Sequence, residues 1–183
     1  MADFKTSYKL TGGNEGGYAN DPHDRGGETY AGIARNFWPN WKGWAYVDAA
    51  KKQYGSNIHA INASLKANPV VQDLVSGFYM ANFWNVDQLS HINDQRVADT
   101  LYDCSVNQGT GEAAHILQDA CNVLSIPKIK SDGAIGPATL VMANSLDAEL
   151  LYGEINEFRK ASYKKDKGFD RYGAVWLSRL TKY

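Results

Sequence analysis

Three side chains near the N-terminus have the types and spacing that cleavage of a glycosidic bond requires. Asp24 follows Glu15 by nine residues, and Thr29 follows Asp24 by five. Such cleavage uses a protonated carboxylic acid beside the leaving oxygen, and a second group that activates water or stabilises the oxocarbenium-like transition state. Glu15 is the candidate acid, Asp24 the candidate second carboxylate, and Thr29 the candidate for orienting the water.

The segment before Glu15 predicts a helix over residues 3–11. Phe4, Tyr8 and Thr11 share one helical face with Glu15, and glycines at 12, 13, 16 and 17 end the helix. The negative end of the helix dipole and nearby aromatic rings disfavour a charged carboxylate, so we expect a raised pKa for Glu15. Asp24 lies in a wet, glycine-rich loop and is expected to stay ionised.

The same residues also allow a purely structural interpretation. Glu15 can be a solvated residue at a helix end, and Asp21 and Asp24 can be turn formers. Asp21 and Glu28 also place further carboxylates in this region. Spacing alone therefore leaves the second carboxylate open, with Asp24 ranked first and Asp21 second.

The composition excludes several classes of function. The 183 residues include 19 Lys and Arg and 20 Asp and Glu, which gives a formal net charge of −1. Nucleic-acid-binding proteins are usually basic, so we expect no nucleic-acid partner. The four histidines share no spacing typical of metal ligands, and Cys104 and Cys121 form neither a metal motif nor a disulfide framework. We therefore expect no metal and no cofactor.

The start of the chain bears on its location. The first ten residues, MADFKTSYKL, lack the long apolar stretch of a secretory signal, and no later run is long enough to cross a bilayer. We expect a monomer that is synthesised in the cytoplasm and does not insert into a membrane. For a target beyond the membrane, a holin or a secretion channel is the expected export partner.

Hydrophobic periodicity predicts a mainly α fold. Residues 70–83 carry a wide apolar stripe, and Gly136-Pro137 places a proline at the first position of a helix. Residues 19–36 are rich in turn-forming residues and predict a loop with a small hairpin. Further helices are predicted at 93–107, 111–124, 147–164 and 169–183.

Residues 14–33 resemble the signature of glycoside hydrolase family 108. The resemblance rests on Glu15-Gly16-Gly17-Tyr18, followed by a proline-containing loop, two glycines, Thr29 and Gly32-Ile33. It assigns Glu15 to the position of the family's catalytic glutamate. The spacing of Glu15, Asp24 and Thr29 is also similar to the glutamate, aspartate and threonine triplet of phage-type lysozymes.

Later segments resemble the same family in the same order. Residues 78–84 are similar to its aromatic helix, and residues 103–109 to its Asp-x-x-Val-Asn-x-Gly segment. Residues 114–124 and 132–139 resemble the predicted peptidoglycan-binding segment that accompanies it. The resemblance implies a lysozyme-like helical globule, with a catalytic segment at 1–96 and a peptidoglycan-binding-like segment at 97–183 packed together.

The resemblance also implies an activity. This is metal-free hydrolysis of the β-1,4 bond between N-acetylmuramic acid and N-acetylglucosamine in peptidoglycan strands, with Tyr18, Asp21, Tyr30 and Asn107 as substrate-binding candidates. One alternative is a lytic transglycosylase, which needs the acid but no water-holding aspartate. Another is a non-catalytic module that binds peptidoglycan or assists secretion.

Two further features allow more than one interpretation. Trp38, Trp41 and Trp44 are predicted core or loop anchors, and one of them is also a candidate for stacking on a sugar. Eight basic residues lie between positions 159 and 182, against Asp166 and Asp170. Such a run is usually a solvated helix face, although it can also attract anionic wall polymers.

Overall fold

A computed structural model describes residues 1–11, 16–21 and 25–181 of the chain. Glu15, His23 and Asp24 lie outside the described residues. The chain forms two compact units, the larger from Met1–Thr11 and Ala81–Tyr183 and the smaller from Gly12–Met80. These units are defined by packing, whereas the predicted segments 1–96 and 97–183 are defined by function, and that functional division stays a prediction.

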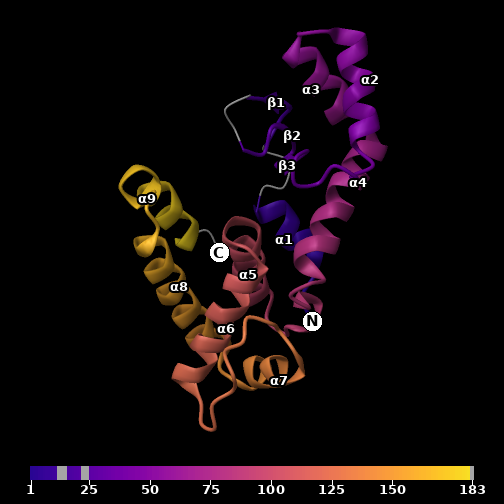
Figure 1. Ribbon diagram of the computed structural model, residues 1–183. Coiled ribbons are helices and arrows are strands. Elements are labelled where there is room, and N and C mark those ends of the chain that lie inside the picture. The colour runs from indigo at the N-terminus through magenta and orange to yellow at the C-terminus, as the bar shows by residue number, and fades with distance from the viewer. Residues whose placement is uncertain (12–15, 22–24, 182–183) are drawn as a thin grey trace. The chain divides into compact units, whose positions relative to one another are not determined.

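In its described residues, the smaller unit combines a short antiparallel sheet with three helices (Figure 1). The strands have the order β1-β2-β3, and Ala19 and Ala34 both pair with Thr29 of the middle strand. Helix α3 packs against α2 and α4. The elements are β1 (Ala19–Asn20), β2 (Glu28–Tyr30), β3 (Ile33–Ala34), α2 (Trp44–Tyr54), α3 (Ile58–Ala67) and α4 (Pro69–Tyr79).

The turn between β2 and β3 depends on a glycine. Ala31 and Gly32 both have positive φ angles, 48° and 75°, as in the type I′ turn that suits a two-residue hairpin. The Tyr79 hydroxyl donates a hydrogen bond to the Ala31 carbonyl at 2.8 Å. A Cβ atom on Gly32 would lie 2.6 Å from that hydroxyl oxygen. Both the backbone conformation and the contact with α4 therefore favour glycine at position 32.

The tryptophans of the smaller unit act as anchors. The Trp41 ring stacks on Tyr30 at 6.4 Å between centroids, and its indole nitrogen donates to the Leu74 carbonyl at 3.3 Å. The buried Trp44 donates its indole N–H to the Trp38 carbonyl at 2.8 Å. These contacts connect three parts of the unit: the sheet, helix α4, and the loop that precedes α2. Stacking of one of the rings on a sugar stays a prediction.

The larger unit is helical in its described residues and is built around α5 (Gln95–Gln108), which is buried continuously from Val97 to Ser105. Helix α5 packs against α1, α6 and α8, while α6 also contacts α7 and α8 contacts α9 (Figure 1). A π-helical turn, Met80–Trp84, follows α4, and 3-10 turns cover Leu89–His91 and Arg179–Thr181. The remaining helices are α1 (Phe4–Thr11), α6 (Thr110–Leu124), α7 (Pro137–Ser145), α8 (Ala148–Lys165) and α9 (Phe169–Ser178).

These elements confirm the predicted mainly α fold class with a small hairpin within residues 19–36. Helix α7 begins at Pro137, as Gly136-Pro137 predicts. Across the described ranges, none of the helices combines the length and the apolar character needed to cross a membrane.

The buried Gln118 holds the Asp132-Gly133 turn against α6. Its amide oxygen accepts from the backbone N–H groups of Asp132 and Gly133, both at 3.0 Å. Its amide nitrogen donates to the Asp132 carboxylate at 2.9 Å and to the Ala134 carbonyl at 3.0 Å. A buried amide is tolerated when its polar atoms are paired in this way. The turn motif and Gln118 therefore form one structural unit.

Asp87 gives the stability of the larger unit a predicted pH dependence. Its side chain is 2% exposed and accepts a hydrogen bond from the Ser105 hydroxyl. Burial raises the pKa of Asp87 from 3.8 to about 6. Because the folded protein favours the protonated carboxyl, this group supports the fold fully below pH ~4 and loses that contribution as the pH rises through about 6.

We expect Asp87→Asn to be more stable than the wild type at pH 7, by on the order of 2–3 kcal/mol. The substituted amide stays neutral, and its oxygen can still accept from Ser105. Urea unfolding of both proteins between pH 4 and 8 measures the difference, which should vanish at the acid end. A constant difference across this range would show that Asp87 does not titrate as its burial indicates.

Candidate functional site

The smaller unit contains a cavity of about 230 Å³ whose lining begins with the residue that directly follows Glu15 in the sequence. Gly16 and Gly17 form part of its lining, together with Tyr30 at the end of β2 and Ala31 of the following turn. Helices α3 and α4 contribute the other lining residues, which are Asn62, Lys66 and Gln72. Asn62 and Lys66 are four residues apart and so share one face of α3.

The glycine pair fits between the hairpin turn and α3. A Cβ atom on Gly16 would lie 3.0 Å from the backbone nitrogen of Gly32, and one on Gly17 would lie 2.8 Å from the Asn62 amide nitrogen. The backbone N–H of Tyr18 donates to the Asn62 amide oxygen at 2.6 Å. Close packing therefore explains two small residues at this point of the Glu-Gly-Gly-Tyr motif.

Glu28 is a buried carboxylate with three partners. It accepts a hydrogen bond from the Tyr18 hydroxyl at 2.8 Å, and it pairs with Lys51 at 2.5 Å and Arg35 at 2.9 Å. Arg35 also pairs with Asp48 at 2.9 Å. This network connects β2, the segment before β1 and α2, so the structure assigns a stabilising role to Glu28, which the sequence left open as a nearby carboxylate.

The same network acts on its two titratable neighbours. Burial, followed by the hydrogen bond to the Glu28 carboxylate, raises the pKa of Tyr18. The hydrogen bond to Glu28 also raises the pKa of Lys51. Both shifts keep the protons on the two donors and preserve the network.

The other predicted residues of this unit take different positions. Tyr30 lines the cavity, and its hydroxyl accepts from the Gln72 amide at 3.4 Å. Thr29 is the next residue back along β2, so strand alternation points it to the opposite side, where its hydroxyl donates to the Gly27 carbonyl at 3.4 Å. Asp21 is exposed just after β1. The cavity thus includes Tyr30, whereas Thr29 and Asp21 do not line it.

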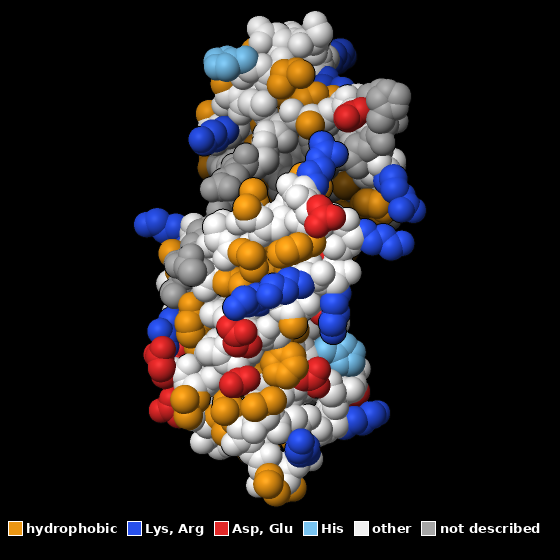
Figure 2. Space-filling view, turned by 90° about the vertical axis from the view of Figure 1, so that its left-hand side faces the viewer, with side chains coloured by type: hydrophobic (Ala, Val, Ile, Leu, Met, Phe, Trp, Pro, Cys, Tyr) orange, Lys and Arg blue, Asp and Glu red, His pale blue; other side chains and the backbone are white. Residues whose placement is uncertain are grey.

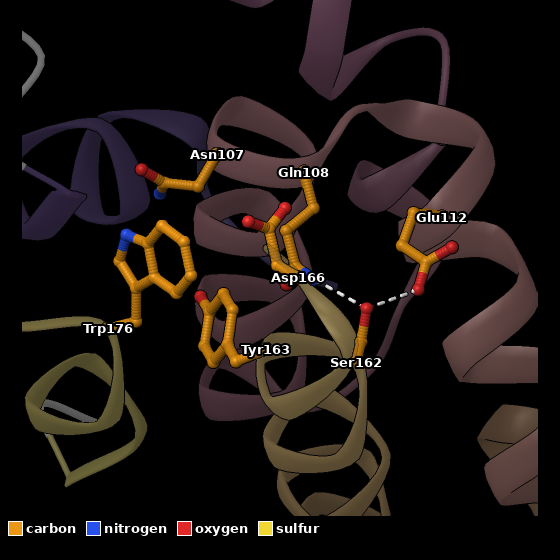
Figure 3. Close-up of a pocket in the computed structure, with 7 residues that line it drawn as sticks. All are labelled: Asn107, Gln108, Glu112, Ser162, Tyr163, Asp166 and Trp176. Carbon is orange, nitrogen blue, oxygen red and sulfur yellow. Dashed lines mark hydrogen bonds between the residues drawn. The ribbon is translucent and has the colours of Figure 1, made fainter. Parts of the chain in front are cut away.

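Asn107 belongs to the larger unit, near the C-terminal end of α5. Its side-chain amide donates to the backbone carbonyl of Asp103 at 2.6 Å and to the Asp103 carboxylate at 3.2 Å. Asn107 also lines a second cavity, which is drawn in Figure 3. Its predicted contact with substrate stays a prediction.

The interpretation of the basic residues between 159 and 182 as a solvated helix face is wrong for Arg159. Arg159 is fully buried and pairs with the fully buried Asp103 at 2.5 Å, and Arg179 contacts the other oxygen of Asp103 at 3.1 Å. On the side of the molecule where α8 and α9 lie, Figure 2 shows basic, acidic and apolar side chains interspersed. Part of the basic run is therefore structural, and the face in view is not uniformly basic.

Residues 8–109 match the sequence model of the family described as glycosyl hydrolase 108. The chain belongs to glycosyl hydrolase family 108. It is therefore a glycoside hydrolase. The family 108 match includes the cavity at Gly16 and Gly17, strands β1, β2 and β3, and α5 with Asn107. Residues 110–183 lie beyond the match, and their binding to peptidoglycan stays a prediction.

Among solved structures, this family 108 chain is similar to SagA from Brucella abortus. The TM-score is 0.66 and the sequence identity is 24%, over 98% of this chain and 90% of that chain. At this identity the likeness establishes the fold, in agreement with the predicted mainly α class. No curated protein matches the chain.

Within the described ranges, the family 108 chain has no group of three His, Cys, Asp or Glu side chains that could hold a metal ion. The chemistry that its described cavities offer comes from hydroxyl, amide, carboxylate and ammonium groups.

Proposed function

We propose that this family 108 enzyme is a muramidase, which hydrolyses the β-1,4 bond between N-acetylmuramic acid and N-acetylglucosamine with Glu15 as the general acid. Family membership supports a peptidoglycan hydrolase in general. One observation carries the proposal that Glu15 is the general acid of a muramidase. It is the cavity lined by Gly16 and Gly17, the two residues that directly follow Glu15 in the Glu-Gly-Gly-Tyr motif.

The cavity offers groups that suit a sugar ring. Asn62 has an amide that can donate to and accept from hydroxyl groups. The amide nitrogen of Gln72 already donates to Tyr30 and Leu65, so Gln72 offers its oxygen as an acceptor. Tyr30 adds an aromatic ring with a hydroxyl. In the proposed reaction, Glu15 protonates the leaving oxygen, and ionised Asp24 holds the attacking water or stabilises the developing charge on the sugar. The sequence predicts Thr29 as the residue that orients the water and Asp21 as the second candidate for the role of Asp24, although neither side chain lines this cavity.

The same proposal places the reaction in the periplasm or cell wall. A holin or a secretion channel would carry the enzyme from the cytoplasm to its substrate. Fractionation of cells with and without a co-expressed holin checks this step. The enzyme should leave the cytoplasm and release fragments of the cell wall only when the holin is present.

The end groups of a wall digest test the proposed bond and mechanism. Purified peptidoglycan is incubated with the full chain, reduced with borohydride and analysed by mass spectrometry. New reducing ends on N-acetylmuramic acid are expected. Anhydro-muramyl ends would instead identify a lytic transglycosylase, and reducing N-acetylglucosamine ends would identify cleavage of the other glycosidic bond. A digest without new ends would favour the binding or secretion-assisting module.

A further inference from the structure

The larger unit contains a cavity of about 370 Å³ that includes Asn107, a predicted substrate contact, but to which the proposed reaction assigns no chemical step. It is formed by the C-terminal end of α5, the first turn of α6, the end of α8 with the residue that follows it, and α9. Its lining residues lie wholly within this unit and differ from those of the cavity at Gly16 and Gly17.

An aromatic pair forms one side of this cavity. The rings of Trp176 and Tyr163 are stacked at 5.7 Å with an interplanar angle of 29°, and Tyr172 lies against Trp176 at 5.9 Å. The Tyr163 hydroxyl accepts a hydrogen bond at 3.1 Å from Arg159, which is buried and paired with Asp103. The pair is therefore held in place from the interior of the protein.

A chain of hydrogen bonds forms the opposite side. The Gln108 amide donates to the Ser162 hydroxyl at 2.9 Å, and Ser162 donates to the Glu112 carboxylate at 2.6 Å. The Gln108 oxygen accepts from the Cys104 thiol at 3.3 Å. Figure 3 shows the two rings on one side and the Gln108, Ser162 and Glu112 chain on the other. These bonds fix the Glu112 carboxylate relative to the rings.

Two more side chains add hydrogen-bond acceptors. Asp166 accepts the backbone N–H of Gly168 at 2.7 Å, which orients its carboxylate. Asn107 directs its amide nitrogen at Asp103, so within the described part of the chain its oxygen is the atom available to a ligand. The described lining contains two carboxylates and neither Lys nor Arg. This lining disfavours phosphates and other anions.

We propose that this cavity is a second carbohydrate-binding site, which takes one neutral pyranose residue of a glycan strand. The flat face of the sugar would lie against Trp176, and its hydroxyl or acetamido N–H groups would donate to Glu112, Asp166 and Asn107. The stacked ring supplies apolar contact, and the fixed acceptors supply direction. The site would bind the same glycan strands that the proposed reaction cleaves, so its ligand choice rests on the proposed function.

The lining also fits a small organic cation. An ammonium group could lie over the Trp176 ring and pair with Glu112 or Asp166. The sugar is favoured because the amide oxygen of Asn107 and the two carboxylates are spread around the cavity, which matches several donors on one ring better than a single charge. A cationic probe is therefore part of the test.

Calorimetric titration of the full chain with the trisaccharide of N-acetylglucosamine tests the site. We expect Trp176→Ala and the nearly isosteric Glu112→Gln each to weaken one binding event by about tenfold. Val175→Ala, on an exposed neighbour in α9, and Glu157→Gln, on exposed α8 surface, are the matched controls and should bind like the wild type. Circular dichroism verifies that each variant is folded.

Two results would overturn the proposal. Trisaccharide binding that is unchanged in both Glu112→Gln and a folded Trp176→Ala would overturn the proposal. Binding of butylamine that depends on Glu112, with no binding of the trisaccharide, would overturn it in favour of a cation site. The titration does not depend on hydrolysis, so a failure of the muramidase assignment would appear in the end-group analysis alone.

Discussion

Glu15→Gln is expected to lower the rate of peptidoglycan hydrolysis at least ~100-fold, the lower end of the effect of a general acid. Gln has nearly the same shape as Glu but no proton of suitable acidity for the leaving oxygen. The substitution should therefore affect the chemical step far more than it affects folding. The initial rate of formation of reducing ends in purified peptidoglycan measures the loss.

Glu157→Gln is the matched control, because it makes the same chemical change at an exposed position of α8. Its rate should equal that of the wild type, and both variants should unfold at the same urea concentration as the wild type. A Glu15→Gln enzyme with near-wild-type activity would remove Glu15 from the acid role and return it to the solvated helix-end interpretation.

The same assay identifies the second carboxylate. If Asp24 must be ionised, Asp24→Asn should lose activity, and its residual rate should lack the decline that the wild type shows towards acid pH. Asp21→Asn should keep both the rate and the pH profile. The reverse pattern would assign the role to Asp21, and full activity in both variants would leave Glu15 without a carboxylate partner.

The sequence predicted those elements whose apolar residues form a clear stripe. Val71, Val75 and Tyr79 are buried along α4, within the predicted helix 70–83. Helices α2 and α3 were not predicted, for two different reasons. Helix α3 buries only Ile61 and Leu65, and α2 follows a run of tryptophan, proline and glycine that favours a loop.

At the candidate site, the sequence located the glycine motif but not the reason for its small residues. The close approach of Gly16 to Gly32, and of Gly17 to Asn62, joins segments that are far apart along the chain. Local patterns carry no information about such contacts. The same limit explains why Arg159 was read as part of a charged face, since its partner Asp103 is 56 residues away.

Removal of the Asp103 carboxylate is expected to lower the free energy of unfolding by about 3–5 kcal/mol. Asp103→Ala leaves Arg159 charged, fully buried and without its anion, and it also removes the carboxylate partner of Arg179. Urea unfolding at pH 7 measures the loss. Glu157→Ala, which breaks an exposed pair with Lys160 on the same helix as Arg159, should change stability little.

A double substitution separates the loss of attraction from the cost of an unpaired buried charge. Asp103→Leu with Arg159→Met replaces both buried ions with apolar side chains, so it should recover more than half of the stability that Asp103→Ala loses. It also removes the donor to the Tyr163 hydroxyl, so trisaccharide binding beside Trp176 should remain weakened even where stability returns. Equal losses from the double variant and Asp103→Ala would show that the fold needs the specific geometry of the ion pair. Recovered stability together with wild-type binding would show that Arg159 does not position the aromatic pair.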